Sequence, residues 1–362
     1  MRFARIIYQY KYDLSQTPED DLWPGDGNLG DCMQSLAVEN IYGKIGIPES
    51  ELLHVNRDDI KKYNGEKCAL IMQAWFGNYA NVFPLPWSEK IFPIFIGFHL
   101  SPSRHTRERF LKEGISEKMK PYQPIGCRDR STRDFLRSIG IRAYFSGCMT
   151  LTFDKRSKAP ECGKIFIVDV DKRSFEKIPE YIKQNSDCSI THRYYWNGYP
   201  VSEEGALAFE NHARMVLARY RDEAKLVITS KIHVAMPNIA MGIPVVFISD
   251  NIDDERFDVL EGIIPIYSYR DAARVNWDPD PVEISDLKNA IIKNAISQIT
   301  GKNGNESAGE LECIANQLKC IDYLPFGGRF FRSLTNAFSL AKRRKLRILF
   351  LNNIIKLKKY FR

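Results

Sequence analysis

Several features that would point to common protein classes are missing from this sequence. No CxxC pair occurs among the eight cysteines, so neither a zinc site nor a dithiol redox motif is indicated. No run reaches the roughly 18 apolar residues of a membrane span, and the first apolar stretch is too short for a signal peptide. No HExxH motif or paired-carboxylate spacing supports a metal hydrolase. We therefore expect a cytoplasmic protein with reduced thiols and no metal.

Excess positive charge is confined to the C-terminal end. The 362 residues include 52 Lys and Arg against 45 Asp and Glu, which gives a formal net charge of +7. Residues 342–362 alone hold nine Lys and Arg and no acid, so the rest of the chain carries 43 basic and 45 acidic residues. A nucleic-acid-binding surface would place positive charge across the body as well. The near-neutral body therefore argues against a nucleic-acid partner.

Strand and helix patterns alternate along the chain, which predicts an α/β fold with parallel sheets. The segments with strand patterns are Arg5–Tyr10, Ala69–Phe76, Phe92–Leu100, Pro124–Cys127, Arg142–Phe145, Lys164–Val170, Cys188–Tyr194, Leu226–Thr229 and Val245–Ile248. The segments with helix patterns are Cys32–Ile45, Thr106–Lys112, Thr132–Ile139, Glu203–Asp222 and Leu287–Ile299.

A polar segment with Pro and Gly, Asp154–Gly163, separates two such series. Because 362 residues exceed one ordinary core, we expect two Rossmann-like domains that face each other across a cleft, residues 1–155 and 156–330. Residues 331–362 follow as a basic amphipathic tail. In open α/β sheets ligands bind beyond the carboxyl ends of the strands, so loops that follow strands are the first candidates for a site.

The first candidate is a glycine-rich loop that opens a helix, GDGNLGD at residues 25–31. Glycines let the backbone approach a ligand, and a helix N-terminus offers unpaired N–H groups. Its candidate binding residues are Asn28, Gly30, Asp31 and, further on, Gln34, and Asp31 suits the N-cap position. A turn followed by a helix cap explains the same spacing, and the loop does not match a P-loop.

The second candidate begins where the apolar strand that ends at Cys127 stops. Arg128 follows at once, and Ser131 is placed to cap the next helix. An arginine at the carboxyl end of a strand can bind phosphate or carboxylate through a bidentate fork. An ion pair between Arg128 and Asp129 accounts for the same residues without a ligand.

The third candidate lies between two buried apolar runs, after the strand that ends at Thr229. Thr229 or Ser230 is placed to cap a helix, which directs the N-terminal dipole toward Lys231 and His233. A cation, an imidazole and a helix end together suit an anionic ligand with a proton to move. The alternatives are a solvated charge for Lys231 and a core position for His233.

Two further features near these loops complete the candidate set. His192 stands at the end of a predicted strand, next to Arg193, and is a second candidate for the cleft. Pro237 interrupts the helical pattern after His233 and predicts a kink or a late helix start. No supporting constellation surrounds the other histidines, which are His54, His99, His105 and His212.

Four short motifs follow one another along the chain. They are Asn28-Leu29-Gly30-Asp31 with Gln34, Gly126-Cys127-Arg128-Asp129 with Thr132, Ser146-Gly147-Cys148-Met149-Thr150-Leu151-Thr152, and Thr229-Ser230-Lys231-Ile232-His233 with Gly242-Ile243-Pro244. This series resembles the polysaccharide pyruvyl transferase family over residues 5–270. The resemblance implies a GT-B-like fold and transfer of pyruvate from phosphoenolpyruvate, a co-substrate, onto two hydroxyls of a sugar. The product is a cyclic ketal on a cell-surface polysaccharide, such as a capsule or exopolysaccharide, or on its lipid-linked precursor, and no cofactor is implied.

The resemblance also implies roles for the candidate residues. Arg128, Lys231 and Ser230 would bind the phosphate and carboxylate of the donor, and His233 would move the proton. This chain departs from the family at Lys231, where arginine is usual, because lysine keeps the charge and loses the bidentate fork.

Residues 1–155 would form the acceptor side and residues 156–330 the donor side. We expect acceptor contacts around Trp75 and His99. Further contacts with substrate would come from Asn28, Gly30, Asp31, Gln34 and His192.

Residues 334–361 place apolar side chains among clustered Lys and Arg at approximately helical spacing. This pattern is typical of a helix that lies on an anionic membrane, and it predicts a peripheral protein on the inner face of the membrane. A solvated helix packed back on the body, or a disordered basic end, fits the same pattern.

Two other functions fit this sequence. A GT-B glycosyltransferase that uses a nucleotide sugar would share the fold and the basic cleft, with Glu255 or Asp258 as the acid that contacts ribose. A family member without activity would instead act as a membrane-associated scaffold for glycan assembly. The pyruvyl transferase hypothesis requires Arg128, Lys231 and His233 to converge in one cleft.

Overall fold

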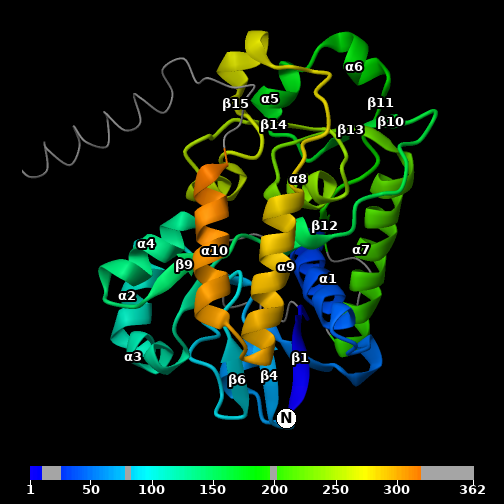
Figure 1. The fold of residues 1–362 in the computed structure, drawn as a ribbon. Coiled ribbons are helices and arrows are strands. Elements are labelled where there is room, and N and C mark those ends of the chain that lie inside the picture. The colour runs from blue at the N-terminus through cyan, green and yellow to red at the C-terminus, as the bar shows by residue number, and fades with distance from the viewer. Residues whose placement is uncertain (10–25, 78–82, 196–201, 319–362) are drawn as a thin grey trace, which may run out of the picture. The chain divides into compact units, whose positions relative to one another are not determined.

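Two parallel β-sheets organise the part of the chain that the structure describes. The computed structural model describes residues 1–9, 26–77, 83–195 and 202–318, which Figure 1 draws as the coloured ribbon. Both sheets belong to the same compact unit. The prediction of a mixed α/β fold with parallel sheets is therefore confirmed, whereas the predicted domain boundaries stay predictions.

The first sheet has the strand order β3-β1-β4-β6, and all of its pairings are parallel. Its strands are β3 (Leu53–Asn56), β1 (Arg2–Ile7), β4 (Cys68–Ile71) and β6 (Ile91–Ile94). Strand β4 is buried over its whole length, as expected for a parallel strand covered on both faces. Helix α1 (Leu29–Lys44) packs against β1 and runs beside α7 (Glu203–Glu223) in Figure 1.

The second sheet has the order β11-β10-β13-β14-β15 and is also parallel. Its strands are β11 (Ser186–Asp187), β10 (Lys164–Val168), β13 (Ala224–Thr229), β14 (Val245–Ser249) and β15 (Ile266–Ser268). The apolar run of the central strand β13 is buried, which fits a strand covered on both faces. Helix α8 (Ile232–Ala240) follows β13 almost directly and packs on β14.

Three two-stranded pairings complete the frame. Strands β5 (Trp75–Phe76) and β7 (His99–Leu100) pair in parallel, and so do β8 (Ile125–Cys127) and β9 (Ala143–Phe145). Strand β2 (Asp26–Asn28) pairs antiparallel with β12 (Arg193–Tyr195), and Leu29 N donates to His192 O over 2.9 Å. This ribbon ties the start of α1 to the segment that follows β11.

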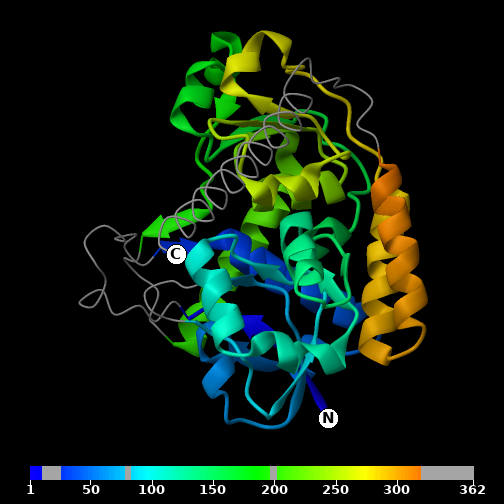
Figure 2. The same ribbon diagram turned by 90° about the vertical axis from the view of Figure 1, so that its left-hand side faces the viewer.

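The remaining helices cover the sheets and their edges. They are α2 (Arg104–Lys112), α3 (Ile115–Met119), α4 (Arg130–Ser138), α5 (Lys172–Glu176), α6 (Glu180–Gln184), α9 (Ser285–Thr300) and α10 (Gly304–Gln317), with 3-10 turns that include η4 (Arg57–Lys62), η6 (Met149–Thr152) and η7 (Glu255–Leu260). Helices α9 and α10 lie side by side in Figures 1 and 2. Among the described residues, no helix has the length and apolar character that crossing a bilayer requires. The predicted basic tail lies outside the described residues.

The structure corrects three predicted strands. Cys188–Tyr194 is not one strand, because a turn closed by the side chain of Asp187 diverts the chain between β11 and β12. Ala69–Phe76 and Phe92–Leu100 each divide into two strands. The break in the second of these contains Gly97 with φ of 65°, a left-handed conformation that regular strands do not have.

Candidate functional site

A cavity of about 460 Å³ lies where the carboxyl ends of strands from both sheets meet. Its wall is formed by the start of α1, by the loops after β3, β8, β10, β13 and β14, and by η7. The lining residues are Asn28, Asp31, Arg57, Trp75, Arg128, Asp169, Asp171, His192, Arg193, Ser230, Lys231, Ile232, His233, Ser249, Asn251, Asp254, Arg256 and Phe257. A second cavity, of about 470 Å³, lies against α4, β9 and α10 and contains none of the predicted site residues.

Seven of the nine residues predicted to form the site line the first cavity. They are Asn28, Asp31, Arg128, His192, Ser230, Lys231 and His233. The other two, Gly30 and Gln34, lie behind its wall and contact residues that line it. The three loops thus converge on one cavity.

The glycine-rich loop enters α1 earlier than predicted. Asn28, not Asp31, is the N-cap, and its Oδ1 accepts a hydrogen bond from Gly30 N over 2.9 Å. The helix starts at Leu29, which places Asp31 in the first turn, where it lines the cavity. Gln34 Nε2 donates to Asp31 Oδ1 over 3.2 Å, so the amide of Gln34 holds this carboxylate from behind.

Gly30 is required by packing. A Cβ atom at this position would lie 2.7 Å from the Cβ and 3.1 Å from the Nδ1 of His233. The first of these distances is shorter than real Cβ contacts, and the Cβ of His233 cannot rotate away because it is fixed to the backbone. The missing side chain of Gly30 therefore makes room for the imidazole of His233.

Arg128 is almost fully buried, at 2% exposure, and lines the cavity. Its Nη1 donates to Gln34 Oε1 over 3.3 Å, and its Nε lies 3.8 Å from Asp129 Oδ2. That carboxylate has nearer partners, because Asp129 bonds to His99 Nδ1 and to Thr132 N. Among the described residues, Arg128 therefore has one carboxylate partner, Asp129, which lies 3.8 Å away and also binds His99 and Thr132 N.

Asp129, not Ser131, caps α4 by accepting from Thr132 N over 2.8 Å. Burial alone would raise the pKa of Asp129, but the adjacent His99 imidazole and Arg128 guanidinium lower it to about 2. The carboxylate thus stays ionised beside the buried cation. His99, around which acceptor contacts are predicted, is buried and is not among the residues that line the cavity.

The loop after β13 places Lys231 at the N-cap position of α8. Neither Thr229 nor Ser230 caps this helix. Thr229 Oγ1 accepts from Lys231 N over 3.0 Å, while Ser230 Oγ donates to Ile248 O and accepts from Asp171 N over 2.9 Å. The Ser230 hydroxyl thus holds the loop against β14 and against the loop that follows β10. Pro237 lies inside α8 and does not delay its start.

Lys231 is neither a free solvated charge nor buried. Its Nζ lies 2.9 Å from Asp171 Oδ1, and its side chain is 33% exposed. The other oxygen of Asp171 accepts from Ser249 Oγ over 2.7 Å and from Asp250 N over 3.2 Å. Lys231 therefore stands at the cavity in a fixed ion pair.

His233 lies at the cavity wall with 9% exposure, and its Nε2 is 3.8 Å from Cys148 Sγ. Burial lowers the pKa of His233 well below its usual value, and the charge of Arg128 lowers it further. The imidazole is therefore neutral at physiological pH. His233 therefore packs in the core and also reaches the cavity, so it has features of both predicted alternatives, a core residue and a site residue.

His192 is held as part of the wall. Its Nε2 lies 2.9 Å from Tyr220 Oη, and its backbone N donates to Asp169 Oδ2 over 2.8 Å. Burial lowers the pKa of His192 to about 4, so this imidazole is also neutral at physiological pH.

Sequence reasoning missed several residues of the wall. Arg57 follows β3, Asp171 follows β10 and Asn251 follows β14, so a search of every position after a strand would have found them. Arg256 gives no such signal, since it lies on η7 and forms a bidentate pair with Asp254.

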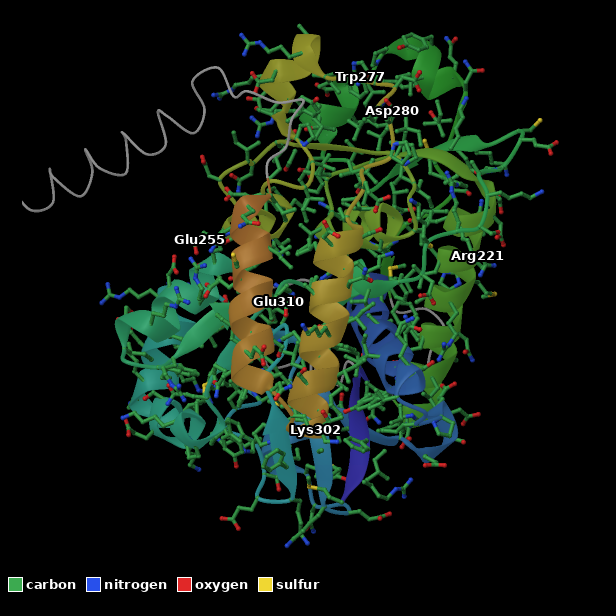
Figure 3. All side chains as sticks on the ribbon, in the orientation of Figure 1. Arg221, Glu255, Trp277, Asp280, Lys302 and Glu310 are labelled. Carbon is green, nitrogen blue, oxygen red and sulfur yellow. The ribbon has the colours of Figure 1, made fainter. Side chains whose placement is uncertain are left out.

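The two acids predicted to contact ribose hold η7 on α4. Asp258 Oδ2 accepts from Arg130 N over 2.9 Å and from Ser131 N over 3.1 Å, and Ser131 Oγ donates to Glu255. Glu255 is labelled in Figure 3. Neither acid lines the cavity. Among the described residues, no cluster of three or more His, Cys, Asp or Glu has a geometry that could hold a metal.

A sequence model of the polysaccharide pyruvyl transferases matches residues 28–251, more than half of the chain. The chain belongs to the polysaccharide pyruvyl transferase family. The match starts and ends at residues that line the cavity, Asn28 and Asn251. Membership in this family supports a role in pyruvyl transfer during polysaccharide biosynthesis.

Comparisons with individual proteins are less informative than the family match. The structure resembles that of an uncharacterised protein from Klebsiella pneumoniae subsp. pneumoniae, at 18% identity and a TM-score of 0.41, over 71% of this chain and 87% of that one. No curated protein matches.

Proposed function

We propose that this polysaccharide pyruvyl transferase takes its pyruvyl group from phosphoenolpyruvate and forms a ketal with two hydroxyls of a sugar. The acceptor is a cell-surface polysaccharide or its lipid-linked precursor. The observation that carries the proposal is the buried Arg128, which lines the cavity beside His233 and has a single, long ion pair to Asp129 among the described residues. A buried guanidinium whose one carboxylate partner is shared with His99 and Thr132 N keeps N–H donors for an anionic ligand.

The donor has a phosphate and a carboxylate, and the cavity supplies separate cations for them. We assign the bidentate fork of Arg128 to one group, and Lys231 with the N-terminus of α8 to the other. Lys231 would share its charge between the ligand and Asp171. Ser230 would act by holding the loop, since its hydroxyl already has two backbone partners.

The reaction moves two protons and breaks one C–O bond. C3 of phosphoenolpyruvate accepts a proton, the first sugar hydroxyl attacks C2 and loses its proton, and the C2–O bond breaks with its electron pair leaving on phosphate. The second hydroxyl then closes the ketal and loses its proton. One hydroxyl proton ends in the new methyl group and the other on phosphate. We assign these proton transfers to His233, because it lines the cavity.

The acceptor would enter from the side of the first sheet. Trp75 lines the cavity there, and the guanidinium of Arg57 lies 5.8 Å from its ring centroid. An aromatic face offers apolar surface to the C–H face of a sugar, and a guanidinium donates to its oxygens. In this proposal the two sheets are the two halves of a GT-B-like enzyme.

Ligand-induced stabilisation of the full chain tests the donor. Phosphoenolpyruvate is expected to raise the melting temperature, and UDP is not. Arg128→Lys, which keeps the charge and loses the fork, is expected to reduce this shift, whereas Arg142→Lys at an exposed position is not. Stabilisation by UDP but not by phosphoenolpyruvate would overturn the proposal in favour of a glycosyltransferase. Phosphate release with lipid-linked acceptors that is equal in wild type and His233→Ala would favour an inactive scaffold.

A further inference from the structure

The two ring nitrogens of His233 have different surroundings. Nε2 points away from the cavity to the thiol of Cys148, 3.8 Å away. Nδ1 has no hydrogen-bond partner among the described residues, yet it is not one of the fully buried atoms left without a partner. It therefore keeps accessible surface, and the accessible space at this residue is the cavity.

Cys148 belongs to the one sequence motif to which the proposed function gives no role, residues 146–152. Its side chain is fully buried, and burial raises the pKa of its thiol, so the sulfur keeps its proton. Thr150 Oγ1 lies 3.1 Å from the sulfur, and Gln73 Nε2 donates to it over 4.0 Å. The S–H can point to Thr150 and leave a sulfur lone pair for His233.

The opposite side of the ring is also fixed. The backbone of Gly30 lies so close to His233 that a Cβ there would come within 3.1 Å of Nδ1. Gly30 and Cys148 thus confine the imidazole from α1 and from η6. A ring held in this way cannot exchange the positions of its two nitrogens without moving one of these elements.

We propose that Cys148 is a positioning residue that keeps the proton of neutral His233 on Nε2. The lone pair of Nδ1 then faces the cavity, and Nδ1 is the atom that exchanges protons with the substrate. An imidazole N–H is a stronger donor than a thiol, so the bond runs from Nε2–H to sulfur. Which tautomer His233 adopts does not depend on the proposed function. The use of this tautomer in catalysis rests on the proposed function.

Burial is the main reason why the pKa of His233 is lowered, and nearby charges lower it further. The cations that add to the effect of burial are Arg128 after β8 and Arg256 on η7, and His192 and His99 would add to it only when they are protonated. All of these groups disfavour the imidazolium. The anionic group of the donor that binds at Arg128 would offset its charge and favour protonation of Nδ1 when the donor is present.

The tautomer can be observed directly by ¹⁵N NMR of the full chain with labelled histidine, with the His233 signals assigned by comparison with His233→Gln. At neutral pH without ligands, the wild type is expected to show Nε2 protonated and Nδ1 unprotonated. Cys148→Ser keeps an acceptor and is expected to keep this tautomer, whereas Cys148→Ala is expected to show a mixture. Cys68→Ala serves as the control, because it removes a buried thiol at the start of β4 that does not line the cavity.

A proton on Nδ1 in the wild type, or an unchanged tautomer in Cys148→Ala, would overturn the proposal. If Cys148→Ala does not fold, the wild type and Cys148→Ser still decide the question. In the pyruvyl transfer assay, Cys148→Ala is expected to lower kcat about tenfold, with little effect on KM for phosphoenolpyruvate and with partial rescue by serine. If the tautomer is as proposed but no ketal forms, the proposed function fails and the role of Cys148 in placing the proton stands.

Discussion

Arg128 Nη1 donates a hydrogen bond to Gln34 Oε1 over 3.3 Å, although the two residues are 94 positions apart. The amide nitrogen of Gln34 donates in turn to Asp31 Oδ1. One amide thus faces a cation with its oxygen and a carboxylate with its nitrogen, which fixes its orientation. This relay connects the glycine-rich loop with the arginine loop behind the cavity wall.

Gln34→Leu has nearly the same volume and removes the hydrogen bonds to Arg128 and Asp31, together with a longer one to Gly30 O. We expect phosphoenolpyruvate to bind about fivefold more weakly, because a lost hydrogen bond that orients Arg128 is worth about 1 kcal/mol. Isothermal titration calorimetry measures this change. Gln298→Leu removes a half-buried amide on α9, far from the cavity, and equal weakening in both variants would contradict the relay.

Gly30→Ala is expected to displace His233. The added Cβ would lie 2.7 Å from the Cβ of His233, so we expect a loss of about 1–3 kcal/mol in the free energy of unfolding and at least a tenfold loss of activity. Gly43→Ala on the same helix has nothing within 4 Å and is expected to stabilise the protein by up to about 1 kcal/mol. Urea denaturation compares the two, and full activity in Gly30→Ala would refute the packing argument.

Lys231→Met removes the cation that stands opposite Asp171. We expect the affinity for phosphoenolpyruvate to fall about tenfold or more, as for loss of a hydrogen bond to a charged group. Lys231→Arg is expected to retain the affinity because it keeps the charge and adds the fork. Lys225→Met removes an exposed lysine from β13 and is the matched control. An unaffected Lys231→Met variant would exclude Lys231 from donor binding.

The lowered pKa of His192 predicts how the free energy of unfolding depends on pH. Its pKa is lowered to about 4 in the folded protein, against an ordinary value of 6.5, so the unfolded chain binds the additional proton between these values. Stability from this group is complete above pH 6.5 and is lost as the pH falls toward 4, by about 3 kcal/mol in total. His192→Gln should lose correspondingly less over this range in urea denaturation. His105→Gln, at an exposed position, should follow the wild type.

The basic tail predicts membrane binding from sequence alone. Deleting residues 340–362 removes most of its apolar and basic side chains, so we expect the truncated protein to leave anionic liposomes in a flotation assay. The full chain is expected to bind anionic liposomes and not neutral ones. Binding that survives the deletion would show that the anchor lies elsewhere.

The positions of the arginine loop and of the loop after β13 could be predicted from the sequence, because each follows an apolar run and ligands bind beyond the carboxyl ends of strands. The glycine-rich loop could be predicted from its glycines, which stand before a helix pattern. The residues that cap the helices could not be predicted in this way. Asp31 and Ser131 are good capping residues, but Asn28 and Asp129 lie two or three positions earlier and take the role. Local spacing cannot rank two such neighbours, and the further bond of Asp129 to buried His99 depends on the tertiary fold.

Contacts between segments that are distant along the chain could not be predicted from the sequence either. The contact of Cys148 with His233 spans 85 positions and needs η6 to pack on α8, which no local pattern indicates. Arg256 follows no strand, and its place in the wall results from the docking of Asp258 on the N-terminus of α4.

The ribbon of β2 and β12 has a consequence for exchanging parts between related enzymes. It pairs Asn28 with Arg193 and Gly27 with Tyr194, so the start of α1 shares a ladder with the segment after β11. A chimera divided between the two sheets would separate these partners and leave backbone groups beside the cavity unpaired. Residues 26–29 and 192–195 should therefore be transplanted together.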